Sequence, residues 1–265
     1  MPDFALPNTY DFVEAYNGDT STSTRQTISN TGVWNELIAS TSEQCDFLYF
    51  SVEPGSTAIL QNCSADLGVG GSGSEEIIIE GVQLYGKSSG NKSQIVWAPI
   101  SIPAGSRVSV RFNNDADAKY IQLILFKGSF AAGPAMAEVF RTDDSINNAG
   151  VTIDPGATAN TKGAWTEVEA STLYTMNGFY LVLGANDNNA TTIANFLIEV
   201  AVGGSGSEEI ISGDIAFGQT ATELSVGSYY IPVKVAQGQR ISVRAQCSIT
   251  DANDRLIDAS IVGIR

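Results

Sequence analysis

Histidine is absent from the 265-residue sequence, and this absence restricts the chemistry that the chain can perform. Without histidine there is no Ser-His or Cys-His nucleophile pair, no imidazole base, and none of the commonest ligands of zinc and iron. The three cysteines, Cys45, Cys63 and Cys247, lack the Cys-x-x-Cys spacing of metal and redox motifs. The sequence therefore predicts a protein that is not an enzyme and needs no cofactor.

Basic residues are scarce, because 14 Lys and Arg stand against 29 Asp and Glu, for a formal net charge of −15. A chain without a basic face cannot replace the counterions of nucleic-acid phosphates, so we expect no nucleic-acid partner. No apolar run approaches the roughly 18 residues of a membrane helix. The N-terminal MPDFALPNTYDF also lacks the charged start of a signal peptide. We expect a chain made in the cytoplasm that does not span a membrane.

What the sequence does contain is an internal duplication. The decapeptide VGGSGSEEII occupies residues 69–78 and returns unchanged at 202–211. Around it the halves agree loosely at an offset of 131 to 133 residues, for example at Trp34 and Trp165. The linker between the halves is expected to hold at most one short helical turn. We predict four segments: an N-terminal arm (1–20), a first repeat (21–128), a linker (129–150) and a second repeat (151–265).

Apolar and polar side chains alternate within each repeat, which predicts strands with one buried face. In RVSVRF (107–112), Val108, Val110 and Phe112 form the apolar set, and RISVRA (240–245) repeats the pattern. Turns of Gly, Asn, Asp and Pro separate such segments about every ten residues. The sequence therefore predicts an all-β fold of two tandem antiparallel β-sandwich domains, jelly-roll-like, with seven or eight strands each.

The duplicated decapeptide is open to three interpretations. A phosphate-binding loop needs a lysine after its glycines, whereas Glu75 and Glu76 follow here and would repel phosphate. A glycosidase carboxylate pair must share one face, whereas neighbouring strand residues point to opposite faces. The remaining interpretation is a glycine turn of positive φ before a strand. One Glu then faces solvent, and the other bonds backbone amides or the outward Arg107, or Arg240 in the second copy.

Three Asn- and Asp-rich segments, 113–120, 184–192 and 250–255, raise the question of calcium. Ca²⁺ prefers several oxygen ligands from such loops. Asp and Asn also dominate ordinary turns because their side chains bond the local backbone, and none of the segments has EF-hand spacing. Plain turns are therefore favoured over calcium sites, with calcium kept as the alternative.

Cys45 and Cys63 stand symmetrically about Pro54 in the sequence, so a hairpin would bring them opposite each other. Counting by twos from Phe50, however, puts Cys45 on the face away from the core, whereas Cys63 shares a face with apolar residues. Two such side chains cannot meet without a bulge. We therefore expect free thiols and not a disulfide.

Two sets of aromatic residues are candidates for contacts with partners. Trp34 and Trp165 begin strands at equivalent places, where most tryptophans plug the end of a sandwich; Trp165 as a glycan contact is the alternative. The arm has no second copy in the sequence, and a terminal aromatic arm often docks onto a neighbouring subunit. The candidate docking residues are Phe4, Tyr10, Phe12 and Tyr16.

Three motifs in a fixed order carry a family resemblance: W-x-E-L-x-A-S, VG-x-x-GSE and IPAG-x-R-x-x-x-R. Their residues here are Trp34, Glu36, Leu37, Ala39, Ser40, Val69, Gly70, Gly73, Ser74, Glu75, Ile102, Pro103, Ala104, Gly105, Arg107 and Arg111. The second copy keeps Trp165, Glu167, Ala170, Ser171, Val202, Gly203, Gly206, Ser207, Glu208, Gly238, Arg240 and Arg244, and lacks a counterpart of Pro103. This order resembles a module of tailed-bacteriophage virion proteins, over nearly the whole chain apart from the arm and the linker.

The resemblance implies a structural protein of the phage virion, displayed on the particle as capsid decoration or cement, or as a head fibre. Its expected partners are further copies of itself, guessed as a trimer, and other virion proteins such as the major capsid protein. Two alternatives remain open. One is a tail-associated adhesin that binds a host surface glycan as its receptor, and the other is a glycan-cleaving tail protein.

Overall fold

The computed structural model describes residues 11–16, 26–28, 32–54, 61–86, 94–98, 100–113, 119–127, 139–141, 150–185, 194–219, 226–249 and 256–264. These residues form strands, turns and loops, and none of them lies in a helix. Across the same ranges, therefore, no helix has the length and hydropathy that a bilayer crossing requires. The fold class predicted from alternation, all-β, is confirmed.

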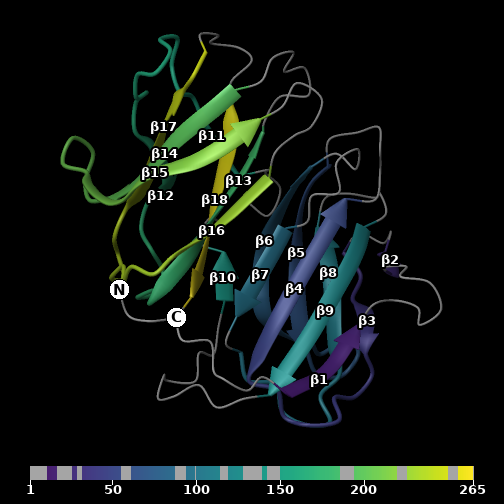
Figure 1. The fold of residues 1–265 in the computed structure, drawn as a ribbon. Coiled ribbons are helices and arrows are strands. Elements are labelled where there is room, and N and C mark those ends of the chain that lie inside the picture. Colours follow the sequence, from purple (N-terminus) through teal and green to yellow (C-terminus); the bar gives the residue numbers. More distant parts are fainter. Residues whose placement is uncertain are drawn as a thin grey trace.

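The described strands fall into two sets of nine (Figure 1). The first set comprises β1 (Asp11–Tyr16), β2 (Gln26–Ile28), β3 (Asn35–Ile38), β4 (Phe47–Pro54), β5 (Gln61–Val69), β6 (Glu76–Gly86), β7 (Gln94–Ala98), β8 (Val108–Asn113) and β9 (Lys119–Lys127). The second set comprises β10 (Val139–Arg141), β11 (Val151–Ile153), β12 (Thr166–Glu169), β13 (Gly178–Ala185), β14 (Ala194–Val202), β15 (Glu209–Gln219), β16 (Val226–Ile231), β17 (Ile241–Cys247) and β18 (Ile257–Ile264).

Each set is an antiparallel sandwich with the strand order of a jelly roll. In the first, β1-β9-β4-β7 form one layer and β6-β5-β8-β3 form the other, with β2 paired to β9. In the second, β10-β18-β13-β16 face β15-β14-β17-β12, with β11 paired to β18. The first strand of each set thus pairs with its last strand. The predicted pair of jelly-roll-like sandwiches is confirmed, but the expected number of strands is wrong: each set has nine described strands and not seven or eight, because short strands pair with β9 and β18 besides the jelly-roll strands.

The segments expected to lie outside the repeats each contribute a strand to a sandwich. β1 comes from the predicted arm, residues 1–20, and pairs antiparallel with β9. β10 comes from the predicted linker, residues 129–150, and pairs antiparallel with β18. Because β1 and β10 hold the same place in their sandwiches, β10 is the structural counterpart of the arm strand. The duplication therefore extends further than the sequence match.

Each sandwich has its own apolar core, built from the alternate residues that the sequence pattern singled out. Val108, Val110 and Phe112 are buried in the first core, as expected. Ile241 and Val243 take the same places in the second. Burying one such side chain contributes about 1.5–3 kcal/mol, so the two cores are the main source of stability.

The two sandwiches are joined by β10 and by a shared apolar face. β10 lies between the two lobes in Figure 1 and pairs with β18 on one edge and, in parallel at Val139 and Ile79, with β6 on the other. One layer of each sandwich thereby joins a single nine-stranded sheet. Residues of β13 and β18 that point away from the second core belong to the first: Tyr180, Val182, Val262 and Ile264.

One expectation about the cysteines is wrong. Cys45 does not face away from the core but is fully buried in the same apolar cluster as Phe50. The reason is a bend at Asp46, which breaks the alternation between Cys45 and β4 and leaves Cys45 in an isolated bridge with Ile102. Cys45 and Cys247 are both thiols, as predicted.

Candidate functional site

The duplicated decapeptide forms the turn between β5 and β6 and, in the second sandwich, between β14 and β15. Gly70 and Gly73 have φ of 118° and 82°, and Gly203 and Gly206 have φ of 110° and 83°. These backbone conformations favour glycine because a Cβ atom would crowd the neighbouring carbonyl. The expected glycine turn of positive φ is therefore confirmed in both copies.

The first glutamate of the decapeptide folds back over its own turn. The Gly73 N–H donates to Glu75 Oε2 at 2.9 Å, and Arg107 Nη1 donates to Glu75 Oε1 at 2.8 Å. The Glu75 side chain is only 1% exposed, whereas Glu76 is exposed to solvent. The two carboxylates therefore diverge, as strand geometry predicts, and the expected partnership of one of them with backbone amide and Arg107 is confirmed.

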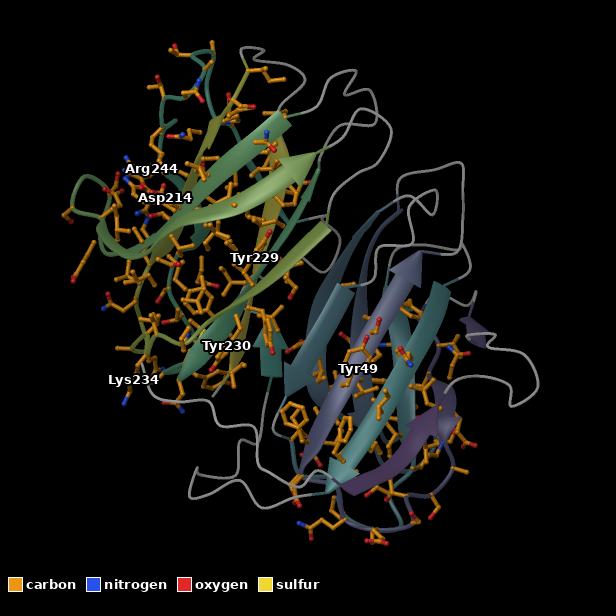
Figure 2. All side chains as sticks on the ribbon, in the orientation of Figure 1. Tyr49, Asp214, Tyr229, Tyr230, Lys234 and Arg244 are labelled. Carbon is orange, nitrogen blue, oxygen red and sulfur yellow. The ribbon has the colours of Figure 1, made fainter. Side chains whose placement is uncertain are left out.

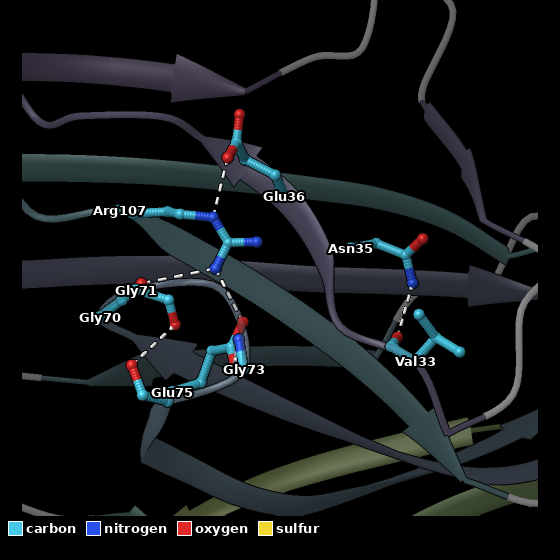
Figure 3. A network of polar contacts seen from close by, with 9 residues as sticks. Val33, Asn35, Glu36, Gly70, Gly71, Gly73, Glu75 and Arg107 are labelled. Atoms are coloured by element: carbon cyan, nitrogen blue, oxygen red, sulfur yellow. Dashed lines mark hydrogen bonds and ion pairs between the residues drawn. The ribbon is translucent and has the colours of Figure 1, made fainter.

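Arg107 is the centre of this network, and Figure 3 shows its contacts. Its Nε donates to Glu36 Oε2 at 2.8 Å, and its Nη1 also reaches the Gly70 carbonyl at 3.4 Å. Glu36 lies on β3 and Arg107 immediately precedes β8, so the guanidinium connects two strands with the β5–β6 turn. A planar guanidinium suits this arrangement because its donors are fixed in direction.

The second sandwich repeats the network with the equivalent residues. Arg240 Nε donates to Glu167 Oε2 at 2.7 Å, and Arg240 Nη1 contacts Glu208 Oε1 at 3.3 Å and the Gly203 carbonyl at 3.2 Å. The Gly206 N–H donates to Glu208 Oε2 at 3.0 Å. The network is thus part of each fold and not a site assembled between them.

The network changes the acid–base behaviour of its members. Burial on its own would raise the pKa of Glu75, but hydrogen bonds from Arg107 and from the backbone N–H groups of Glu75 and Gly73 lower that pKa overall. The pKa of Glu208 is also lowered, first by its own backbone N–H. The hydrogen bonds to Glu36 and Glu75 raise the pKa of Arg107. All three groups are therefore held in their charged forms.

These shifts predict that stability falls in acid. A carboxyl group whose folded-state pKa lies below its unfolded value of 4.5 stabilises the fold fully above pH 4.5. That contribution is lost as the pH falls through the folded-state pKa. The urea concentration at the unfolding midpoint is expected to fall as the pH is lowered below 4.5. The fall is expected to be smaller in the Glu75→Gln/Glu208→Gln variant. An identical acid slope in the double variant would contradict this assignment.

A tryptophan and a second arginine lie beside the first network. The Arg111 guanidinium carbon is 4.7 Å from the centre of the Trp34 ring, and Arg111 Nε donates to Asp66 Oδ2 at 3.0 Å. The Gly81 N–H donates to Asp66 Oδ1 at 2.8 Å. Asp66 and Arg111 are direct cross-strand neighbours on β5 and β8, so the ion pair supports the sheet as well as the stacked ring.

The equivalent tryptophan of the second sandwich, Trp165, is the residue singled out as a glycan contact. Arg244 lies over its ring at 4.3 Å from the centre and donates to Glu199 at 2.7 Å. Lys162 adds ion pairs with Glu199 at 3.3 Å and with Asp214 at 2.8 Å. One face of Trp165 is therefore covered by a guanidinium, and both tryptophans are partly exposed.

Trp34 packs so closely on Gly68 that a Cβ atom there would push the ring from its place. A Cβ atom at Gly68 would lie 2.8 Å from Trp34 Cη2, whereas the second sandwich has Ala201 at the equivalent place. Gly68→Ala is expected to displace Trp34 and to lower the free energy of unfolding by about 1–3 kcal/mol. Tryptophan fluorescence and urea unfolding measure both effects. Gly71→Ala, which meets only the flexible Ser74 hydroxyl, is the control, and an equal effect there would count against the packing argument.

The second sandwich also has an open hollow of about 430 Å³ on its four-stranded layer. Polar side chains from separate segments line it: Asn160, Asn195, Gln246 and Ser248. Leu197 and Ala216 also line it. Amide and hydroxyl groups of this kind both donate and accept hydrogen bonds without carrying charge.

Several predicted residues fall outside the described part of the chain. Phe4 and Tyr10 of the arm are among them, as are most residues of the three Asn- and Asp-rich segments. Phe12 and Tyr16 lie in β1, which pairs with β9 of the same chain. Among the described residues, no three His, Cys, Asp or Glu side chains come close enough to hold a metal ion. Calcium binding and arm docking remain predictions.

Beyond the glutamate of the decapeptide, the acidic partners of the arginines were not assigned from the sequence. Glu36 and Glu167 belong to the repeated W-x-E motif, and this shared spacing is the signal that could have pointed to Arg107 and Arg240. Asp66 and Glu199 stand at the same 133-residue offset and share only their charge, and they belong to none of the three motifs. Their pairing depends on strand register, which only the three-dimensional structure gives.

Comparison with known proteins assigns the chain to no family. The sequence matches no family model and no curated protein. The CBM22-1–CBM22-2 tandem domain of Paenibacillus barcinonensis Xyn10C matches with a TM-score of 0.29 and 10% identity, over 96% of this chain and 98% of that one. The structure of PNGF-II matches with a TM-score of 0.35 and 10% identity, over 97% of this chain and 63% of that one. The structure of the infectious bursal disease virus Gx strain matches with a TM-score of 0.29 and 11% identity, over 84% of this chain and 57% of that one.

Proposed function

We propose that the chain is a non-enzymatic structural protein of a phage virion, displayed on the particle surface as capsid decoration or cement, or as a head fibre. The observation that carries the proposal is the use of the repeated residues. Arg107, Glu75 and Glu36 contact one another, and Arg240, Glu208 and Glu167 do the same, so the repeated motif serves the stability of each sandwich.

The way in which the sandwiches are joined supports the same function. β10 connects one layer of each sandwich into a nine-stranded sheet, and four apolar residues of the second sandwich are buried in the first core. A shared sheet and a shared apolar face suit a protein that contacts a particle with one part and presents another. Jelly rolls are common in viral capsid proteins and in lectins, although a fold alone does not determine function.

Labelling of purified virions with an antibody against the chain tests this location. Dense labelling of the head in negative-stain images is the expected result, and labelling confined to the tail would contradict it. Release of oligosaccharide from host glycans by the purified chain would contradict the non-enzymatic part of the proposal and favour the glycan-cleaving alternative. The net charge of −15 supports the proposal in one further way, because it makes the packaged genome an unfavourable binding partner.

The hollow on the second sandwich favours one further candidate, the tail-associated adhesin. Its uncharged amides and hydroxyl suit a neutral polyhydroxylated ligand such as a host glycan. Glycan-array binding that is lost in Asn195→Ala and Gln246→Ala, and retained in Trp165→Phe, would assign binding to the hollow. Loss in Trp165→Phe alone would assign it to the tryptophan. An array without binding would remove this candidate.

A further inference from the structure

The junction between the two sandwiches uses one particular pair of strands. β6 of the first sandwich presents an edge, and β10, the first strand of the second sandwich, lies along it at Val139 and Ile79. At the same junction the outer face of β13 and β18 is covered, with Tyr180 and Val262 buried in the first core. The contact therefore combines strand pairing at an edge with burial of an apolar face.

The same two elements recur elsewhere in the chain. Because both sandwiches have the same strand order, β15 is equivalent to β6, and β1 is equivalent to β10. In the part of the chain that the structure describes, both β15 and β1 end the order of their sheets, with no strand on the far side. The chain thus forms one junction, between β6 and β10, within itself. The edges of β15 and β1 are the two parts that a second junction of the same kind would need.

We propose that these halves join different copies of the chain, so that β15 of one copy pairs with β1 of the next in the manner of β6 with β10. The occupant of each edge is a second copy of this chain because the matching surface is already present in every copy. The contact is heterologous, and repetition of it either closes a ring or extends a row of copies. The inference rests on the junction alone and holds whether or not the chain is a virion protein.

The register of the contact follows from the pairing within the chain. Val139 pairs with Ile264 on β18, and the equivalent residue of β9, Phe126, pairs with Phe12 on β1. On the other strand, the residue 133 positions after Ile79, the offset of the decapeptide, is Ser212. Phe12 of one copy is therefore expected opposite Ser212 of its neighbour.

An apolar face of the first sandwich completes the match. In the first sandwich, Phe47 pairs with Phe126, and Tyr49 pairs with Ile124. In the second, Gly178 pairs with Ile264, and Tyr180 pairs with Val262, in the same register. The outer face of β4 and β9 is therefore equivalent to the outer face of β13 and β18, which the junction covers. Phe47, Tyr49, Ile124 and Phe126 are all partly exposed, whereas Tyr180, Val262 and Ile264 are buried. Figure 2 shows Tyr49 midway along β4 in the front layer.

Two differences make the contact between copies weaker than the contact within the chain. Ser212 is polar and half-buried where Ile79 is apolar and fully buried. Each copy also carries a net charge of −15, so neighbouring copies repel one another. Because salt screens this repulsion, association is expected to strengthen with ionic strength, opposite to an interface held by attraction between charges.

Disulfide trapping tests the register directly. A Phe12→Cys chain and a Ser212→Cys chain are mixed at high salt, oxidised, and separated on a non-reducing gel, with the linked peptide identified by mass spectrometry. A 12–212 link between chains is the expected product. Phe12→Cys mixed with Ser205→Cys, at the exposed tip of the turn, is the matched control and is expected to give none. Equal linking in both mixtures would overturn the register.

Sedimentation velocity tests the face without introducing cysteines. The unmodified chain is expected to associate with rising concentration and salt, and Ile124→Glu to weaken that association at least about tenfold by placing a charge in the contact. Val33→Glu, an exposed apolar site beside the distant edge strand β3, is the control and should leave it unchanged. A chain that stays monomeric at every salt concentration, or one weakened equally by both changes, would overturn the proposal while leaving a virion location intact.

Discussion

Arg107→Ala is expected to lower the urea midpoint of unfolding clearly, and by more than any other single change in the network, because it removes the charged partner of two carboxylates at once. The Glu75 side chain is 1% exposed, and after the change it keeps only backbone N–H donors such as that of Gly73. Glu36 loses the same partner but is half exposed and can be hydrated. Urea unfolding followed by circular dichroism gives the size of the effect.

A double variant separates the lost ion pair from the lost side chain. Arg107→Met/Glu75→Gln removes both charges, so it is expected to be more stable than Arg107→Met alone. Arg240→Ala should reproduce the loss in the second sandwich because Arg240 makes the equivalent contacts. Additive effects of the two single changes at residues 75 and 107 would show that the pair contributes nothing through its charges.

Gly70→Val and Gly203→Val are each expected to cost about 2–4 kcal/mol, from an unfavourable backbone conformation and a clash. The φ angles are 118° and 110°, and an added Cβ would lie 3.0 Å from the Ser74 carbonyl oxygen and 2.8 Å from that of Ser207. Both obstacles are backbone atoms, which cannot move aside cheaply. Thermal and urea unfolding of the two variants give the values.

Glu76→Gln is the matched control for the glycine variants, since it changes the same decapeptide at an exposed side chain. It is expected to change the free energy of unfolding by no more than about 0.5 kcal/mol. Loss of a binding activity in Glu76→Gln, without loss of stability, would show that the decapeptide is a binding site and not only a turn.

The sequence was enough to predict the all-β class, the paired sandwiches and the chemistry of the decapeptide, because each depends on local pattern. Alternation placed Val108 and Ile241 in their cores, and glycine spacing indicated the turn. Features that depend on long-range pairing were not accessible. β10 has three residues and little pattern of its own, and the face of Cys45 depended on a bend that no single residue type marks. The partners of Arg111 and Arg244 required the register of strands far apart in the sequence.

The covalent connection between the two repeats explains why the small contact between β10 and β6 can form. Only one residue pair, Val139 with Ile79, connects β10 to β6, too little to hold separate chains together without further buried area. Within one chain, the covalent connection between the two repeats keeps β10 near β6 at an effective concentration of the order of millimolar. Fusion of the two repeats thus raises the local concentration of the two strands, so that a weak contact forms. Contacts between separate copies lack this covalent connection. They are expected to form most readily where many copies are held at high local concentration on a common support.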